Sequence, residues 1–168
     1  MRLSNSLLAI ATLCCAALGG HAYAGQDLKT MAGSACQFTD PAEIIFSKDI
    51  SFAFEGGRIR NVGTKDVSVV CPIVRDNINN TGVFSVGVRV QGIGDEVVLC
   101  TLTSRDVFGR QVGLDDFQTG GEQGAELLAL LVNKSGVRGT YELRCLLPPG
   151  GSVINYQYNE PTPTEDLP

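Results

Sequence analysis

The sequence predicts an all-β protein, an antiparallel β-sandwich of about eight or nine short strands braced by disulfides. Three observations support this prediction. Short runs rich in Val, Ile, Phe and Tyr alternate between apolar and polar residues. Gly, Asn, Asp and Pro separate these runs and supply turns. An even number of cysteines remains once an N-terminal leader is set aside. A partly open barrel is the alternative architecture.

The first 24 residues have the features of an export signal. Arg2 is basic, residues 7–18 form an apolar stretch, and Ala22-Tyr23-Ala24 is an A-x-A cleavage motif. The apolar stretch is too short to span a membrane, although a lipid on Cys14 or Cys15 is a minor alternative. We therefore expect a secreted or periplasmic protein with one domain at residues 25–160 and a disordered tail at residues 161–168.

The clearest strand pattern covers residues 83–103. Its first half alternates apolar residues with polar or small ones, and its second half is rich in β-branched residues. Gly92-Ile93-Gly94-Asp95 interrupts the pattern, so the stretch predicts a β-hairpin. The apolar residues of its first strand are Phe84, Val86, Val88 and Val90.

Short strands are also expected before this stretch. Residues 25–40 are weakly patterned and are expected to run along the surface. Pro72 closes the strand that precedes it, because proline cannot donate a hydrogen bond to a neighbouring strand. Residues 76–82 have the Asn, Asp and Gly content of a loop. The expected strands are residues 43–46, 51–54, 58–61 and 67–71.

After this stretch, residues 107–112 are expected to form a short strand and residues 114–124 a long exposed loop with three acids and three glycines. Residues 125–132 contain good helix formers but are short and flanked by glycine, which favours a buried strand over a helix. The last two strands are expected at residues 137–147 and 153–158. The alternation places Tyr141, Leu143 and Cys145 on one face of the first of these strands. It places Ile154, Tyr156 and Tyr158 on one face of the second.

Four cysteines remain after the signal, namely Cys36, Cys71, Cys100 and Cys145. In an exported chain they predict two disulfides. Three pairings are possible, and we favour Cys36 with Cys71 and Cys100 with Cys145, because each pair then joins neighbouring segments. A four-thiolate metal site is the alternative, but the sequence lacks the C-x-x-C spacing that such sites commonly use.

Composition excludes several classes of function. Without the signal, 12 basic residues stand against 18 acidic ones, a net charge of −6, and no basic run exists to bind nucleic acid or an anionic membrane. The only histidine, His21, lies in the signal. This excludes Ser-His-Asp and Cys-His catalysis and histidine-ligated metals. The lack of tryptophan weakens the case for a sugar-binding platform of stacked aromatic rings.

Two short motifs carry a resemblance to known proteins. Cys71-Pro72-Ile73-Val74-Arg75-Asp76, together with residues 143–148 and the tyrosine-containing last strand, resembles small exported bacterial proteins of unknown function. The likeness covers residues 58–158 and implies an exported β-sandwich without implying an activity. Arg75 and Asp76 are candidate ligand-binding residues, but a structural pair that bonds loop backbone is the favoured interpretation.

Loop carboxylates are the candidates for catalysis. Asp115, Asp116 and Glu122 could serve glycoside hydrolysis, which needs two carboxylates. One of them would need an enclosed apolar site to raise its pKa, and a Gly-rich loop gives no sign of one. The same acids with Asp106 could bind calcium, but the calcium-loop motif is absent.

Tyr156 and Tyr158 could form a binding face if they are exposed, although packing in the core is favoured.

Taken together, the missing histidine, the paired cysteines and the all-β pattern predict a non-catalytic protein, without a cofactor, that binds an envelope glycan or another protein. A pilin-like assembly subunit that accepts a strand from a neighbour is the first alternative. A carboxylate-based polysaccharide hydrolase is the second.

Overall fold

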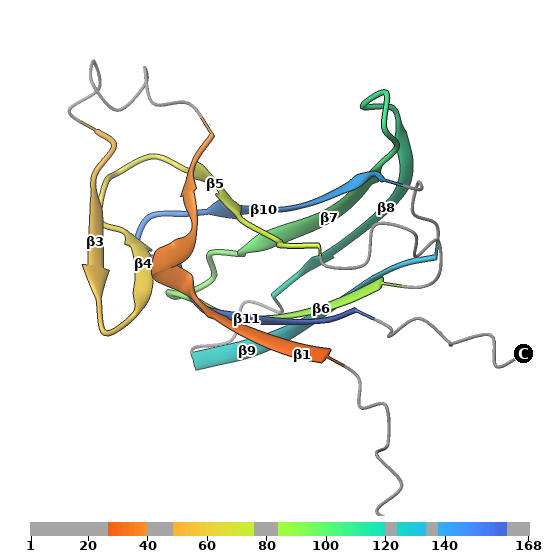
Figure 1. Cartoon of the computed structure of the whole chain (residues 1–168). Helices are drawn as coiled ribbons and strands as arrows, with labels where there is room; N and C mark the ends of the chain where they lie inside the picture. The colour runs from red at the N-terminus through yellow and green to blue at the C-terminus, as the bar shows by residue number, and fades with distance from the viewer. Residues whose placement is uncertain (1–26, 40–48, 76–83, 120–123, 134–137, 161–168) are drawn as a thin grey trace, which may run out of the picture.

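The structure, a computed structural model, describes residues 27–39, 49–75, 84–119, 124–133 and 138–160, which form two antiparallel sheets packed face to face (Figure 1). Sheet A has the strand order β3-β4-β11-β6-β9, and β1 also pairs with β11. Sheet B has the order β2-β5-β10-β7-β8. The predicted all-β sandwich is confirmed, with eleven strands in the described residues where eight or nine were expected.

The strand bounds are as follows. Sheet A contains β1 (Asp27–Ala32), β3 (Phe52–Glu55), β4 (Arg58–Asn61), β6 (Phe84–Gly92), β9 (Gly124–Val132) and β11 (Ser152–Glu160). Sheet B contains β2 (Gln37–Phe38), β5 (Val67–Cys71), β7 (Leu99–Arg105), β8 (Gln111–Gln118) and β10 (Thr140–Leu147). A short 3₁₀ helix, η1 (Gly33–Ala35), follows β1. None of the described residues forms a helix long and apolar enough to cross a lipid bilayer.

The core lies between the two sheets and follows the alternation of each strand. On β5, β6 and β10, every second side chain is buried, while the neighbours between them face outward. Aromatic rings join the two layers, since Phe84 of sheet A stacks on Tyr141 of sheet B with ring centroids 3.8 Å apart. The alternation therefore gives each sheet one apolar inner face and one outer face that is free to carry function.

The hairpin predicted over residues 83–103 is wrong. β6 lies in sheet A and β7 lies in sheet B, so these strands belong to opposite layers of the sandwich and do not pair. The segment between them crosses from one sheet to the other. Its last residue, Val98, is buried and donates its backbone N–H to Thr119 Oγ1 at 3.0 Å. Each strand has an apolar face to bury. The connection over residues 93–98 is longer than the predicted turn, and it lets β6 and β7 bury these faces from opposite sides of the core.

The predictions for residues 107–124 are also wrong in part. The expected strand at residues 107–112 is mostly a turn, and the expected exposed loop contains β8, which pairs with β7 along its length. A register shift between Ser104 and Arg105 accommodates the start of this pairing. β8 is an edge strand, and edge strands tolerate the acids and glycine that suggested a loop.

Residues 125–132 are confirmed as strand β9, in which Leu128, Leu130 and Val132 face the core. Residues 27–32, expected to run along the surface, form strand β1 against β11. The prediction that Ile154 shares a face with Tyr156 and Tyr158 is wrong, because Ile154 is only half-buried while both tyrosines are in the core. A register shift between Val153 and Asn155 turns Val153 into the core instead. The expected strand at residues 43–46 lies outside the described residues.

Asn61 is a buried polar link between the sheets. It ends β4, and its Nδ2 donates to the carbonyls of Lys65 at 2.8 Å and of Leu147, in sheet B, at 3.0 Å. Its Oδ1 accepts the Gly63 N–H at 2.9 Å. A fully buried amide is stable only when its donors and acceptor are paired, so these bonds fix the two sheets at this end of the sandwich.

Candidate functional site

The outer face of sheet B presents one row of side chains across all five strands. The register aligns each residue of the row with the next on the neighbouring strand. On the three inner strands, Val70, Arg144 and Thr101 each lie between two buried residues, so this part of the row faces away from the core. Gln37 and Asp116 lie directly opposite members of the row and therefore share its face. The row consists of Gln37 (β2), Val70 (β5), Arg144 (β10), Thr101 (β7) and Asp116 (β8).

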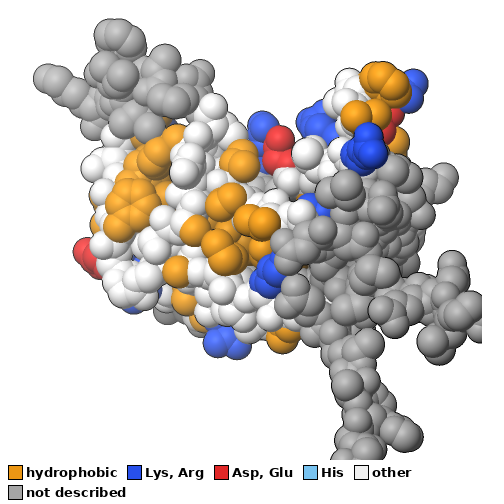
Figure 2. Space-filling model, viewed as in Figure 1, with side chains coloured by type: hydrophobic (Ala, Val, Ile, Leu, Met, Phe, Trp, Pro, Cys, Tyr) orange, Lys and Arg blue, Asp and Glu red, His pale blue; other side chains and the backbone are white. Residues whose placement is uncertain are grey.

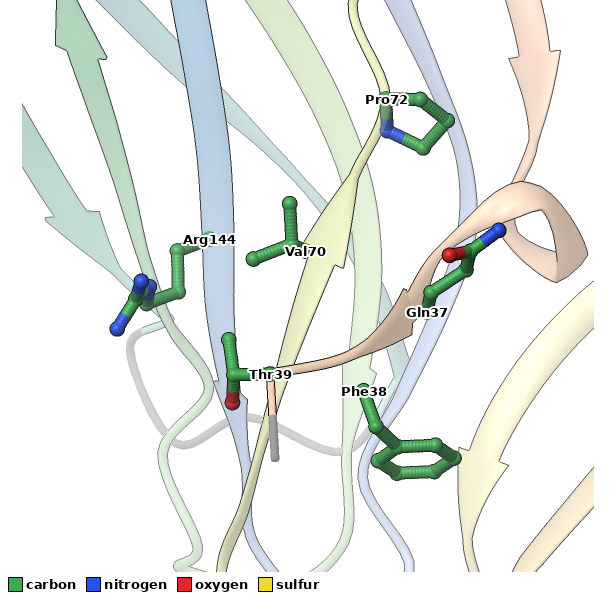
Figure 3. Close-up of a pocket in the computed structure, with 6 residues that line it drawn as sticks. All are labelled: Gln37, Phe38, Thr39, Val70, Pro72 and Arg144. Carbon is green, nitrogen blue, oxygen red and sulfur yellow. The ribbon is translucent and has the colours of Figure 1, made fainter. Parts of the chain in front are cut away.

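A pocket of about 340 Å³ opens on this face over β2, β5 and β10. Figure 3 shows Val70 between Arg144 on one side and Gln37 on the other. Such a volume is at the lower end of the range for small-ligand sites. The lining combines an arginine, an amide and a hydroxyl with apolar groups: Gln37, Phe38, Thr39, Val70, Pro72 and Arg144. We call these six residues the Arg144 pocket.

The two disulfides brace the pocket from below. Cys36 is bonded to Cys71, and Cys100 to Cys145, which is the pairing favoured from the sequence. Each cysteine is buried, while the residues on either side of it in the sequence are exposed or half-buried. As a result, four of the six lining residues lie next to a disulfide cysteine in the sequence: Gln37, Val70, Pro72 and Arg144.

Arg144 is the charged group of the pocket. Its Nη2 lies 2.9 Å from Oε1 of Glu142, the next outward-facing residue on β10, and its side chain is 50% exposed. A guanidinium group has five N–H donors, so this one contact leaves donors that can reach a ligand. Glu142 therefore orients the Arg144 side chain on the sheet while using only part of its hydrogen-bonding capacity.

Tyr156 and Tyr158, candidates for an exposed binding face, are buried in the core as the favoured interpretation held. Tyr156 Oη donates to the Pro72 carbonyl at 2.7 Å, and Tyr158 Oη accepts the Val74 N–H at 3.2 Å. Burial, together with repulsion from Tyr158, raises the pKa of Tyr156 above its usual value. The two tyrosines hold the chain that follows β5, including Pro72 of the pocket.

Arg75 also bonds backbone, as the structural interpretation expected. Its Nη1 donates to the Gly139 carbonyl at 3.0 Å, and its guanidinium lies 5.2 Å from the ring centroid of Tyr141. Asp76, its proposed partner, lies outside the described residues. Arg75 thus anchors the segment after β5 at a point beyond the Arg144 pocket.

The candidate carboxylates do not converge. Asp115 and Asp116 are adjacent on β8 and therefore point to opposite faces of sheet B. Asp115 Oδ2 accepts the Leu131 N–H at 2.6 Å, which ties β8 to β9, whereas Asp116 ends the outward row. Glu122 lies outside the described residues.

Asp106, the further calcium candidate, has a structural role in the turn between β7 and β8. Burial acts to raise the pKa of its carboxyl, but hydrogen bonds from Arg110 and from the Phe108 N–H outweigh this and lower the pKa below its usual value. No three metal-binding side chains come together within the part of the chain that the structure describes.

Sequence reasoning missed most of the pocket, including Gln37, Phe38, Thr39 and Val70. The available signal was indirect. Each cysteine that pairs inside a sandwich forces its sequence neighbours outward, so the residues beside Cys36, Cys71 and Cys145 could have been identified as a shared outer face.

No family model and no curated protein matches this chain. Among solved structures, the C-terminal CBM6 of LamC, a marine laminarinase from Zobellia galactanivorans, shares 16% identity over 80% of this chain and 100% of that one, with a TM-score of 0.48. The CBM36-1 domain of a xylanase from the hindgut metagenome of Trinervitermes trinervoides shares 11% identity over 81% of this chain and 98% of that one, with a TM-score of 0.43. A carbohydrate-binding module from Cellvibrio mixtus lichenase 5A, solved with cellotriose, shares 11% identity over 80% of this chain and 98% of that one, with a TM-score of 0.41. Likenesses this distant do not identify a ligand.

Proposed function

We propose that this chain is an exported, non-catalytic binding protein and that the outer face of sheet B binds a glycan at the Arg144 pocket. The observation that carries the proposal is the mixed lining of the pocket. Sugar hydroxyls both donate and accept, so the donors of Arg144 and the amide of Gln37 can bond them. The C–H face of a sugar ring can pack on the apolar groups of Val70 and Pro72.

The outward row supports a chain ligand over a single sugar. Its five residues span four strand-to-strand spacings, or about 19 Å at ~4.8 Å each. An oligosaccharide laid across the strands would meet Gln37 at one end and Asp116 at the other, with Arg144 between them. The disulfides beneath the row hold its strands before the ligand arrives, which lowers the entropy cost of binding.

Binding is favoured over hydrolysis because the described carboxylates around sheet B do not form a pair on its outer face. Glu142 is paired with Arg144, and Asp115 accepts a backbone N–H from β9 on the other side of the sheet. A glycosidase needs two carboxyl groups that flank one bond. Export is supported by the two disulfides, which persist in oxidising compartments. The likeness to carbohydrate-binding modules agrees with the proposal but does not carry it.

The test is an array of bacterial and plant polysaccharides probed with the labelled protein. We expect saturable binding to at least one glycan, weakened tenfold or more (about 1.4 kcal/mol or more) by Arg144→Ala. The matched control is Arg89→Ala, an exposed arginine on the outer face of sheet A, which should bind normally. A blank array, or equal binding by the Arg144→Ala variant, would overturn the proposal.

A further inference from the structure

The β7–β8 hairpin ends in a tip, residues 106–110, that projects from the sandwich (Figure 1). Figure 2 shows hydrophobic and basic side chains together at this corner of the molecule. Val107 is 60% exposed and Phe108 is 80% exposed, the largest exposed fraction among the large hydrophobic residues that the structure describes. Exposed turns are normally polar, so two consecutive apolar residues here need an explanation.

The turn itself does not require these apolar residues. Asp106 Oδ1 accepts the N–H groups of Phe108 and Arg110, both at 2.9 Å, and Gly109 adopts a positive φ of 77°. Asp106 and Gly109 therefore supply the turn chemistry, while the two central positions accept most residues. Val107 and Phe108 are presented by a turn that is already ordered, which reduces the cost of holding them against a partner.

Two arginines flank the apolar pair. The Nε and Nη2 atoms of Arg110 each lie 2.8 Å from Asp106 Oδ2. Its guanidinium group lies 5.3 Å from the centroid of the Phe108 ring. Arg105 donates to the Gly109 carbonyl at 3.3 Å. The side chain of Arg110 is 74% exposed and that of Asp106 only 13%, so the tip presents positive charge to solvent. The sequence lacks a basic run, but the hairpin brings these separated arginines together.

We propose that the hairpin tip contacts an anionic lipid surface, with Val107 and Phe108 entering the headgroup region and Arg105 and Arg110 facing the lipid phosphates. An apolar point with a basic rim is the pattern by which peripheral segments bind such surfaces. The contact involves a few side chains and no membrane-spanning segment. Its strength is at most that of a single acyl anchor, on the order of 10⁴ M⁻¹, so binding is reversible.

Other partners fit the tip less well. A protein interface buries about 800 Å² on each side, far more than two side chains at a turn can cover. A second copy of the chain offers the Arg144 pocket among the described residues, but Arg144 would repel the two tip arginines. The lipid surface is favoured because it needs neither a large matching area nor a preformed pocket.

The test is sedimentation of the purified protein with vesicles of phosphatidylcholine alone or mixed with phosphatidylglycerol. We expect binding to the anionic vesicles that weakens with added salt. Phe108→Ser should weaken it about tenfold, and Arg105→Gln about fivefold. The matched controls are Phe54→Ser, at a phenylalanine that is 61% exposed on β3, and Arg89→Gln, on the outer face of sheet A. Both controls should bind as the unmodified protein does.

Absence of binding to anionic vesicles would overturn the proposal and leave the tip to a protein partner. Binding that survives Phe108→Ser, or that Phe54→Ser weakens equally, would overturn it as well. The melting temperatures of the variants should match that of the unmodified protein, because the exposed Phe108 ring contributes little to the core. The proposal is independent of the glycan pocket, which lies over other strands of sheet B.

Discussion

Cys100 and Cys145 lie directly opposite each other on β7 and β10 and are joined by a disulfide, and their outward neighbours Thr101 and Arg144 form the next opposed pair. The covalent bond in the core is thus one residue away from the proposed binding face. Both strands are central in sheet B. Stability and ligand binding should therefore depend on the same bond.

The first prediction concerns this disulfide. Replacing both Cys100 and Cys145 with Ala should lower the free energy of unfolding by about 2–5 kcal/mol, because the bond closes a long loop in the unfolded chain. Urea unfolding measures the loss. Reductant should then destabilise the variant further through the Cys36–Cys71 bond. Equal urea midpoints for the variant and the unmodified protein would show that the disulfide does not brace the fold.

The second prediction concerns Asn61, which links the two sheets. Asn61→Ala should cost about 2–4 kcal/mol of unfolding free energy, since the Leu147 carbonyl loses its donor in a buried bond and the Lys65 carbonyl loses its donor in a partly buried one. Asn155→Ala, at a less buried asparagine of β11, is the comparison variant and should change stability much less. A loss of the same size at both positions would contradict the proposed role of Asn61.

The third prediction concerns Tyr156 and alkaline pH. Because burial raises its pKa in the folded protein, the unfolded chain releases the proton first. The protonated Tyr156 therefore contributes fully to the free energy of unfolding below pH about 10, the usual tyrosine pKa. That contribution declines as the pH rises above this value. In Tyr156→Phe, the loss of stability that Tyr156 causes above pH about 10 should disappear. At neutral pH, the free energy of unfolding should fall by about 1 kcal/mol, because the hydrogen bond to the Pro72 carbonyl is lost. Parallel pH profiles for the two proteins would contradict this account.

The fourth prediction separates the two acids of β8. Asp115→Ala should destabilise the protein by about 0.5–1.5 kcal/mol, because the Leu131 N–H loses its acceptor and β8 loses a tie to β9. Asp116→Ala should leave stability unchanged but alter binding of a long glycan, since Asp116 ends the outward row. Thermal unfolding and glycan titration check the two effects. If Asp115→Ala melts normally, the tie between β8 and β9 is not important.

Local pattern was sufficient for much of the fold. The alternation in β5, β6 and β10 and the cysteine spacing predicted buried strands and the disulfide pairing that the structure has. Residues 125–132 were assigned correctly because flanking glycines and shortness outweighed helix propensity.

The errors arose where pairing depends on distant parts of the chain. Nothing local tells β6 and β7 to join different sheets, because a hairpin and a crossing share the same alternation. β8 was missed because an edge strand tolerates Gly113 and adjacent acids. The Arg144 pocket combines residues from three strands, and its members became neighbours only through the register of β2, β5 and β10.

The most direct test of the binding face is a nuclear magnetic resonance titration of ¹⁵N-labelled protein with the glycan that the array selects. We predict that the largest amide shifts fall on Gln37, Val70, Thr101 and Arg144, along the outer face of sheet B. Shifts that cluster instead around Arg89 and Ala129, on the outer face of sheet A, would contradict the assignment of the site.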